Sequence, residues 1–538
     1  MCLERTRKPA GALKGLCLST AVSAAVVVAM MFPAAAAAQV VTAVMQSPLR
    51  VMDPITSSAA ITNTHGYMIY DTLLAMDANY KVQPQMAEKW TVSPDGKTYT
   101  FTLRNGLKWH DGAPVKADDC VSSIKRWAEQ DIMGQMVASL MTDMKVVDDK
   151  SFTMSFQDPT DLVLTALAKI GSRTAFIMPK RIADTPSAQP IKEFVGSGPF
   201  KLVVSEFKPG LKVVYEKNKD YVPRSEPPSW VAGGKVVNVD RVEWVAMPDD
   251  MTAINALTNG EIDYMELLPL DLLPMVEGKK DLKVGVLDQL GLWTYMRLNF
   301  TLPPFNNKQI RQAAMYAIGQ DNILKALAGD SKYYKTCAAI FGCGTPYESS
   351  YGEAMIVKAD PDKAKALLKE AKYDGTPVVI LQPTDNKQVS SQPVVIADAL
   401  RKAGFTVDLQ SMDWQTLVTR RASMKPTAEG GWNIHATTGP LVGTGDPLRN
   451  QTVAASGKKA WFGWPDVPKI EELRMKFARS SNAAEKKALA EEIQKVVIDE
   501  VVVMPMGQFV LPTAYRTSLS GVLDSPVPVF WNVKKTGK

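Results

Sequence analysis

Residues that could perform acid–base chemistry or bind a metal ion are few and scattered in this sequence. The 538-residue chain has three histidines, His65, His110 and His435, which lie far apart. No His-Glu-x-x-His motif and no histidine pair at helical spacing occurs, so a metal site would need distant segments to meet in the fold. We expect His435 to be a neutral side chain whose hydrogen bonds are satisfied inside the protein. The alternative is a histidine that hydrogen-bonds a ligand carboxylate or binds a chelated metal.

Patterns typical of covalent catalysis are missing as well. Ser197 stands between two glycines but lacks the outer glycine spacing of a nucleophile elbow, and no Gly-x-x-x-x-Gly-Lys loop is present to hold a phosphate. A tight turn explains Ser197. Acidic pairs such as Asp118 and Asp119 could act as acid and base, but acids at a helix start are explained by the helix dipole alone. The sequence therefore predicts a protein that is not an enzyme and uses no metal ion or other cofactor.

Two cysteines have a spacing that suits a disulfide bond. Cys337 and Cys343 lie six positions apart beside two glycines, Gly342 and Gly344, and this spacing can close a small loop. The alternative, a pair of metal ligands, lacks a nearby histidine or a second cysteine pair. We therefore predict a Cys337–Cys343 disulfide. Cys120 falls in a predicted helix, where we expect it to be a small buried hydrophobic residue.

The first 38 residues have the pattern of a secretory signal peptide. Basic residues precede an apolar stretch from Leu16 to Phe32, and a run of alanines ends at Ala38. The apolar stretch is shorter than the roughly 20 residues that a membrane-spanning helix needs, and small residues suit cleavage, which we expect between Ala38 and Gln39. An uncleaved membrane anchor is the alternative. We exclude residues 1–38 from the fold and expect a soluble, secreted protein in a compartment that permits disulfides.

The composition of the rest of the chain predicts a globular protein with more than one lobe. Hydrophobic residues make up 46% and charged residues 22% of the chain, and no later apolar run is long enough to span a bilayer. Single cores stop growing near about 250–300 residues, so two or three lobes are expected. Four bases and one acid of the net charge of +6 lie in the signal peptide. The remaining charge is spread without basic blocks, so nucleic-acid binding is not expected.

Local patterns predict a mixed α/β fold. Tyr99, Phe101 and Leu103 alternate with threonines, and Asp95-Gly96 supplies a turn, which predicts a hairpin over 90–103 with one buried face. Asp360 and Pro361 predict the start of a helix over 363–372. Strands are expected at 378–381 and 406–409, with an amphipathic helix over 394–403 between them. This βαβ unit predicts a parallel sheet in the C-terminal half.

A series of landmarks then runs in a fixed order through most of the chain. They are Asp53-Pro54, Tyr70–Leu74, Pro84–Trp90, Ser93–Gly96, Tyr99–Gly106, Trp109–Gly112, Lys116–Asp119, Gly196–Leu202, Asn259–Asp263, Leu298–Phe300, Pro303–Phe305, Ile310–Ala313, Tyr316–Ile318, Asp413-Trp414, Asp446-Pro447 and Gln494-Lys495 through Pro505-Met506. In order and spacing the chain resembles the peptide/nickel class of periplasmic solute-binding proteins of ABC transporters, the dipeptide- and oligopeptide-binding family 5. The stretch from Pro84 to Asp119 is the most specific part of this resemblance.

The resemblance implies a two-lobed periplasmic-binding-protein fold of type II, with an extra inserted subdomain and a hinge between the lobes. We expect the first lobe to comprise residues 39–82, 194–285 and 505–538, the inserted subdomain 83–193 and the second lobe 286–504. The implied function is that of the periplasmic binding component of an ABC importer, which captures a small peptide or peptide-like solute by lobe closure. Its implied partners are this ligand and inner-membrane permease subunits, and we expect a monomer.

The identity of the ligand stays open. In the dipeptide-binding branch an arginine after the first strand of the βαβ unit holds the peptide carboxylate, and residues 382–387 contain no arginine. The aspartate that holds the peptide amine in that branch is replaced by Pro440 after Thr438-Gly439. Simple dipeptides are therefore in doubt. Longer peptides held through their main chain remain possible, as do opine-like, sugar-phosphate or aromatic solutes and metal chelates.

Positions that match the family's landmarks supply ten candidate ligand-binding residues. They are Ser57, Ser58, Asn63, Trp293, Tyr295, Trp432, His435, Thr437, Thr438 and Asp446. An aromatic wall that faces a polar ligand is typical of such clefts, but tryptophans are more often core residues. Asp446 before a proline has a simpler explanation as the start of a turn.

Two other classes of function remain as alternatives. A periplasmic hydrolase would need a nucleophile and a base, and only three histidines are available for it. A periplasmic sensor or chaperone would use the same fold, so only its partners would separate it from a transport protein.

Overall fold

The computed structural model describes residues 38–386 and 388–537. Its contacts group Gln39–Lys538 into one compact unit. The predicted signal peptide lies outside the described residues except for Ala38. Within the described part of the chain, no helix has both the length and the apolar composition that crossing a bilayer requires.

A mixed seven-stranded sheet collects strands from distant parts of the chain, and we call the region built on it the first lobe. Its strand order is β10-β11-β12-β1-β13-β21-β14. The central strand β1 (Val40–Val44) pairs in parallel with β12 (Arg241–Val245) and β13 (Tyr264–Met265). The antiparallel strands are β10 (Phe200–Leu202), β11 (Lys212–Lys217), β14 (Leu282–Gly285) and β21 (Thr513–Arg516). The carboxyl ends of the three parallel strands meet at one edge, where ligands commonly bind in open α/β sheets.

The predicted hairpin belongs to a separate four-stranded antiparallel sheet, and its prediction is confirmed. β5 (Ala87–Val92) and β6 (Thr98–Leu103) pair around a turn in which Gly96 has a φ of 70°. Tyr99, Phe101 and Leu103 are buried, and the intervening threonines are partly exposed. The other strands of the sheet are β7 (Met141–Val146) and β8 (Ser151–Phe156), in the order β5-β6-β8-β7.

Three helices belong to the same part of the chain as this small sheet. They are α2 (Ala117–Gln130), α3 (Ile132–Leu140) and α4 (Leu162–Leu167). Cys120 in α2 is fully buried, as predicted. Asp131 accepts hydrogen bonds from the backbone N–H groups of Met133 and Gly134 and so caps α3.

A six-stranded sheet forms the centre of what we call the second lobe. Its order is β16-β20-β15-β19-β17-β18. The strands are β15 (Leu292–Leu298), β16 (Tyr334–Lys335), β17 (Val378–Pro383), β18 (Val407–Met412), β19 (Ile434–Pro440) and β20 (Met504–Phe509). β17 and β18 pair in parallel and are joined by α11 (Gln392–Lys402), so the predicted βαβ unit is confirmed.

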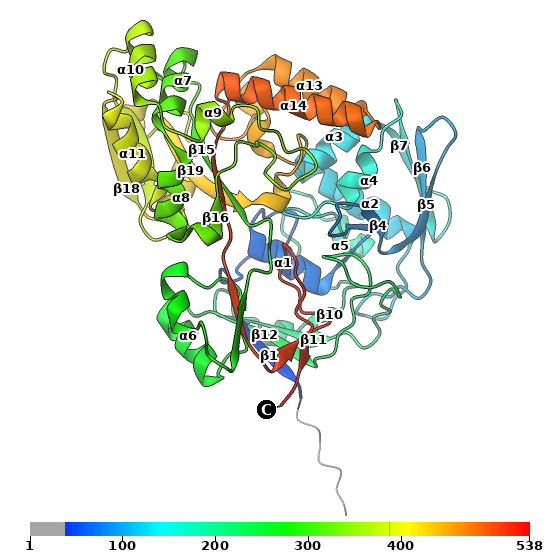
Figure 1. The fold of residues 1–538 in the computed structure, drawn as a ribbon. Helices are drawn as coiled ribbons and strands as arrows, with labels where there is room; N and C mark the ends of the chain where they lie inside the picture. Colours follow the sequence, from blue (N-terminus) through cyan, green and yellow to red (C-terminus); the bar gives the residue numbers. More distant parts are fainter. Residues whose placement is uncertain (1–37, 387, 538) are drawn as a thin grey trace, which may run out of the picture. The chain divides into compact units, whose positions relative to one another are not determined.

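The helices of the second lobe include the predicted one after Asp360. α10 (Pro361–Glu370) begins where the Asp360 carboxylate accepts a hydrogen bond from the backbone N–H of Lys363, with Pro361 in its first turn. Figure 1 shows α13 (Pro468–Arg479) and α14 (Ala483–Glu500) lying side by side, and they are in contact. The remaining helices are α7 (Lys308–Ala317), α8 (Gln320–Ala328), α9 (Glu353–Ile356), α12 (Trp414–Arg420), α13 (Pro468–Arg479) and α14 (Ala483–Glu500).

Short elements complete the chain. The helices are α1 (Ala60–Ile69), α5 (Lys180–Ala183) and α6 (Asp250–Asn259), and the strands are β2 (Asp71–Thr72), β3 (Leu74–Met76), β4 (Val82–Pro84), β9 (Phe176–Ile177), β22 (Leu519–Ser520) and β23 (Lys534–Lys535). Ser197, for which a tight turn was predicted, belongs to a stretch that packs closely on the end of α1. A Cβ added at Gly196 or Gly198 would collide with backbone atoms of Ile69 or Tyr70.

Two neighbouring segments connect the two larger sheets. Val286–Gly291 leads from β14 to β15, and Val510–Pro512 leads from β20 to β21. The segments run together because Gly285 opposes Thr513 at one end and Leu292 opposes Phe509 at the other. β20 pairs with β15 and β16 of the second sheet, whereas we placed residues from 505 onward in the first lobe. According to the sheet pairing, the chain returns from the second sheet to the first between Phe509 and Thr513.

Candidate ligand-binding site

Five of the predicted site residues come together around β15 and β19 of the second sheet. In this antiparallel pair Trp293 opposes Gly439, Tyr295 opposes Thr437 and Arg297 opposes His435. Alternation along the strands puts these side chains on one face of the sheet. The rings of Trp293 and Tyr295 stack with centroids 4.5 Å apart. The fifth predicted residue, Trp432, lies just before β19, with its ring 6.0 Å from that of His435.

Trp461, from the loop before α13, sits at the centre of this face. Its ring centroid lies 6.1 Å from that of Tyr295 and 6.1 Å from that of His435. The guanidinium carbons of Arg297 and Arg421 lie 5.5 and 5.7 Å from the same ring. We call Trp461, Tyr295, His435, Arg297 and Arg421 the Trp461 cluster. It combines two cations with three aromatic rings.

The electrostatics of the Trp461 cluster follow from burial and from its two guanidinium groups. Burial, with both arginines nearby, holds the pKa of His435 well below its ordinary value, so the imidazole is neutral. Burial raises the pKa of Tyr295 to about 12, and the arginines oppose this shift. Burial lowers the pKa of Arg297 to about 10. The site is therefore positively charged at neutral pH.

His435 is neutral, as predicted, but the prediction that its hydrogen bonds are satisfied is wrong. Neither ring nitrogen has a hydrogen-bond partner among the described residues, although the side chain is fully buried. Its surroundings are the rings of Trp432 and Trp461 and the two arginines, none of which offers an acceptor to it. An aromatic environment excludes water without replacing its hydrogen bonds.

Three predicted residues lie in the first lobe near the start of α1. Ser57 accepts a hydrogen bond from the backbone N–H of Ala59 and donates to Thr62, and Ser58 is exposed. Asn63 is buried, and its Oδ1 accepts a hydrogen bond from the backbone N–H of Thr174. Asn63 therefore holds the chain at Thr174 in place.

The remaining predicted residues have different surroundings. Thr438 opposes Thr294, so it lies on the other face of the sheet from Thr437. Trp432 donates from Nε1 to the carbonyl of Arg421 and packs in an apolar group with Leu381. The Asp446 carboxylate accepts hydrogen bonds from the backbone N–H groups of Leu448 and Arg449 and pairs with the Arg449 side chain. These contacts give Asp446 the turn-forming role that was its simpler explanation.

Contacts far from the crossing segments join the second lobe to residues 158–171. The Thr160 hydroxyl donates to the carbonyl of Ala478 at the end of α13, and Lys486 of α14 pairs with Asp161. Beside them a cavity of about 30 Å³ is lined by Leu162, Thr165, Tyr347, Asp446 and Lys486 among others. A Cβ added at Gly171 would approach Gly443 to 3.3 Å.

A second cavity lies at the crossing segments and contains none of the predicted residues. It has a volume of about 210 Å³, and its lining includes Val284, Val286, Tyr333 and Pro512. The volume is below the roughly 300 Å³ at which ligand pockets usually begin. We therefore do not assign the ligand to it.

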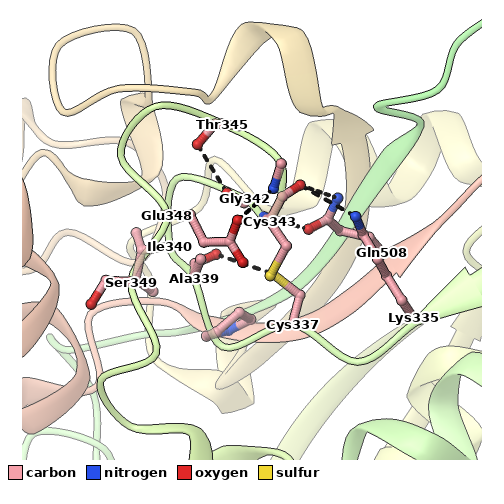
Figure 2. The surroundings of a disulfide bond; sticks show 12 residues. Lys335, Cys337, Ala339, Ile340, Gly342, Cys343, Thr345, Glu348, Ser349 and Gln508 are labelled. Carbon is pink, nitrogen blue, oxygen red and sulfur yellow. Dashed lines mark hydrogen bonds between the residues drawn. A yellow bond between two sulfur atoms is a disulfide. The ribbon is translucent and has the colours of Figure 1, made fainter.

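The Cys337–Cys343 disulfide is present and is anchored to the strand that leads to one crossing. Its two Cα atoms are 6.0 Å apart. Figure 2 shows the Gln508 side chain of β20 against the backbone of Cys343: Oε1 accepts from the Cys343 N–H at 2.7 Å, and Nε2 donates to its carbonyl at 3.3 Å. Gly342 in the same loop packs against Leu441, next to the end of β19.

Sequence reasoning missed Arg297, Arg421 and Trp461, which complete the cluster. Arg421 follows α12, where a basic residue is already explained by the helix dipole. The run Trp461-Phe462-Gly463-Trp464 was the available signal, because three aromatic residues in a loop need a surface to cover. Among the described residues, no group of three or more histidine, cysteine or acidic side chains is placed to hold a metal ion.

Comparisons with known proteins agree on one family. The family model described as "Bacterial extracellular solute-binding proteins, family 5 Middle" matches residues 81–441. A probable peptide ABC transporter periplasmic-binding protein of Sinorhizobium fredii is 39% identical over 490 residues, which cover 90% of this chain and 92% of that protein. A glutathione-binding protein of Salmonella choleraesuis is 26% identical and is covered to 94%, as is this chain.

Solved structures show the same fold. A dipeptide-binding protein of Pseudoalteromonas in complex with Met-Leu superposes with a TM-score of 0.77 at 20% identity, covering 93% of this chain and 100% of the other. A periplasmic binding protein of A. tumefaciens in complex with agropinic acid gives a TM-score of 0.76 at 20% identity, with coverages of 93% and 99%. The two-lobed fold expected from the sequence is thus confirmed.

Proposed function

Because the chain belongs to the bacterial extracellular solute-binding proteins of family 5, we propose that it is the periplasmic binding component of an ABC importer. In this role it captures a small peptide or peptide-like solute between its two lobes and presents it to inner-membrane permease subunits. The relative of 39% identity, which is named as a peptide ABC transporter component, supports this proposal. So does the relation to proteins of the periplasm, to which the predicted signal peptide over 1–38 would deliver the chain.

The observation that carries the mechanism is the pair of adjacent crossing segments. Val286–Gly291 and Val510–Pro512 are the strand connections between the two larger sheets, and they run side by side. A hinge of a few residues lets two rigid lobes move while their cores stay packed. A ligand that touches both lobes binds the closed form better and shifts the population towards it. The contacts of Thr160 and Lys486 then support the closed form.

Within this proposal the first lobe comprises the seven-stranded sheet, residues 83–193 form the inserted subdomain, and the second lobe extends from about 286 to the crossing after Phe509. The ligand is held by residues from both lobes, drawn from the ten candidates named above. The binding role uses no catalysis, and we infer that the protein works as a monomer.

A second candidate is a non-peptide solute bound in the same cleft. A relative of the same fold binds agropinic acid, which is an opine, so this fold accepts such ligands. Two observations favour keeping this candidate: residues 382–387 contain no arginine, and Pro440 stands where the dipeptide-binding branch has its aspartate. A sensor, chaperone or hydrolase role has no comparable support.

The proposal is tested by identifying the molecule that travels with the protein. The mature protein is purified gently from its native periplasm and weighed by native mass spectrometry, and its small molecules are then extracted under denaturing conditions. A stoichiometric peptide is the expected result. A stoichiometric non-peptide solute would support the second candidate, and turnover of added peptides by the purified protein would contradict a pure binding role.

A further inference from the structure

The two arginines of the Trp461 cluster have no carboxylate partner in the described part of the chain. Neither Arg297 nor Arg421 forms an ion pair there, and the charged groups that act on His435 are these same two arginines. Two buried or half-buried cations beside one another are unfavourable without a counter-charge. The cluster therefore has a place for an anion.

The two guanidinium groups have different roles. Arg297 is fully buried and donates hydrogen bonds to the carbonyls of Thr452, Phe462, Val502 and Trp461. Its donors are engaged with the backbone, so its role is structural. The Arg421 side chain makes no hydrogen bond to a described residue, and its buried Nε has no acceptor.

Arg421 is held in place by aromatic rings alone. Its guanidinium carbon lies 4.9 Å from the ring centroid of Phe462, 5.7 Å from that of Trp461 and 5.9 Å from that of Trp414. Such contacts stabilise a cation by roughly 0.5–2 kcal/mol, but they accept none of its N–H groups. The rings thus orient the planar fork and leave its hydrogen bonds unmade.

Other unpaired polar groups belong to the same face. Both ring nitrogens of His435 and the Nε1 of Trp293, whose ring stacks on Tyr295, are buried without a partner. Native proteins leave few buried polar atoms unpaired, and here the Arg421 Nε and the His435 ring nitrogens, whose side chains both lie against the Trp461 ring, lack an acceptor. A carboxylate has two oxygens and suits the fork of an arginine side chain.

We propose that the Trp461 cluster binds the carboxylate of an acidic ligand, which accepts hydrogen bonds from Arg421 and from His435. The inference rests on the proposed binding function and deepens it, because it names the charge of the ligand. The cluster holds no acidic side chain to bind an ammonium group, so the recognised charge is negative. Arg421 is partly exposed and gives the ligand a way in, whereas the His435 nitrogens are buried, and closure of the lobes then excludes water.

The test compares Arg421→Met with Arg297→Met in the mature protein freed of bound ligand. Both substitutions remove one cation from the same cluster and leave an unbranched apolar side chain. Melting temperatures are measured alone and with two matched tripeptide libraries, one with free carboxylates and one of C-terminal amides. We expect the free-acid library to stabilise the wild type and the amide library to fail. The affinity of Arg421→Met for the free acids should be at least about tenfold weaker, the loss of a charge-assisted hydrogen bond.

The ligand-free proteins decide the question independently of the libraries. Arg421→Met should melt much closer to the wild type than Arg297→Met does, because it loses only contacts with aromatic rings, whereas Arg297→Met leaves four buried carbonyls without a donor. If Arg421→Met lowers the melting temperature as much as Arg297→Met does, Arg421 has a structural role and the inference is overturned. Equal stabilisation of the wild type by acids and amides would also overturn it.

Failure of the proposed function gives a different result. If neither library stabilises the wild type, the peptide assignment fails, and the compound extracted from the native protein replaces the libraries as the probe. If the extracted compound is an acid that Arg421→Met no longer binds, this result still supports the anion site. A neutral compound, or an acid that Arg421→Met binds equally well, contradicts it.

Discussion

Single buried groups in this protein have roles that the sequence alone does not reveal. Arg297 and Arg421 differ only in what surrounds them: four backbone carbonyls for the first and three aromatic rings for the second. No sequence pattern singled out either position. The difference appears only when β15, the end of α12 and the loop before α13 are folded together.

Glu266 gives a prediction about pH. It follows β13 at the carboxyl edge of the first sheet, is buried, and accepts a hydrogen bond from the backbone N–H of Gln46. Burial raises the pKa of Glu266 to about 7. The folded protein therefore holds the Glu266 proton more tightly than the unfolded chain does. Glu266 does not lower the free energy of unfolding below about pH 4.5, where it is protonated in both states, and lowers it fully above about pH 7, where it is ionised in both.

Glu266→Gln should therefore stabilise the protein at pH 8 by about 2–3 kcal/mol, because the neutral amide can still accept from Gln46. The gain should shrink to near zero by pH 4.5. Urea unfolding at a series of pH values measures it. A stabilisation that is the same at pH 8 and pH 4.5 would show that Glu266 does not carry this shifted pKa.

Gly291 fixes the geometry of one crossing segment. It has a φ of 67°, and an added Cβ would lie 2.4 Å from the carbonyl oxygen of Phe509 at the start of the other crossing. Both the backbone conformation and the close approach require glycine. Gly291→Ala should destabilise the protein by about 1–3 kcal/mol and weaken ligand binding. Gly278→Ala, also at positive φ but with open space around its Cβ, is the matched control, and equal losses of binding in both variants would contradict a special role for the crossing.

The disulfide loop is the second element with a testable role. The bond closes a loop beside Gln508, whose side chain forms two hydrogen bonds with the backbone of Cys343. Closing a loop of this length constrains the unfolded chain by about 2 kcal/mol in the chain-entropy description. The double variant Cys337→Ser with Cys343→Ser should lower the free energy of unfolding by about that amount. Dithiothreitol should lower the free energy of unfolding of the wild type by the same amount and leave that of the variant unchanged. If dithiothreitol does not change the free energy of unfolding of the wild type, the disulfide does not stabilise the protein.

Elements that depend on local signals were predictable, and the site was not. The hairpin around Gly96 and the helix after Asp360 follow from turn and cap residues within a few positions of each other. The pairing of β20 with β15 and β16 could not be foreseen, because a continuous strand segment carries no mark of the sheet that it joins. The Trp461 cluster combines residues 295, 297, 421, 435 and 461, and no local pattern links positions so far apart.

Across the whole molecule, the contact between α13–α14 and residues 158–162 lies away from the crossing segments. Lys486 is nearly buried and pairs with Asp161, whose side chain is about one third exposed. Removing Lys486 leaves Asp161 able to reach water, so the loss to overall stability should be small. In the proposed mechanism this ion pair forms only when the lobes are closed. Removing Lys486 therefore destabilises the closed form and not the open form, and closure becomes less favourable.

Lys486→Met should thus weaken ligand binding by up to about tenfold while changing the melting temperature of the ligand-free protein little. Isothermal titration with the extracted ligand measures the affinity. Lys469→Met, at an exposed ion pair in α13, is the control and should bind as the wild type does. If Lys486→Met binds with unchanged affinity, the contact plays no part in closure.

In the proposed mechanism, a solute is captured by closure of the two lobes about the paired crossing segments. Small-angle X-ray scattering tests it most directly, on mature protein stripped of its bound molecule and on the same protein after the extracted molecule is added back. We expect a smaller radius of gyration when the molecule returns, because the lobes then close over it. An unchanged radius of gyration at saturating ligand would contradict capture by closure.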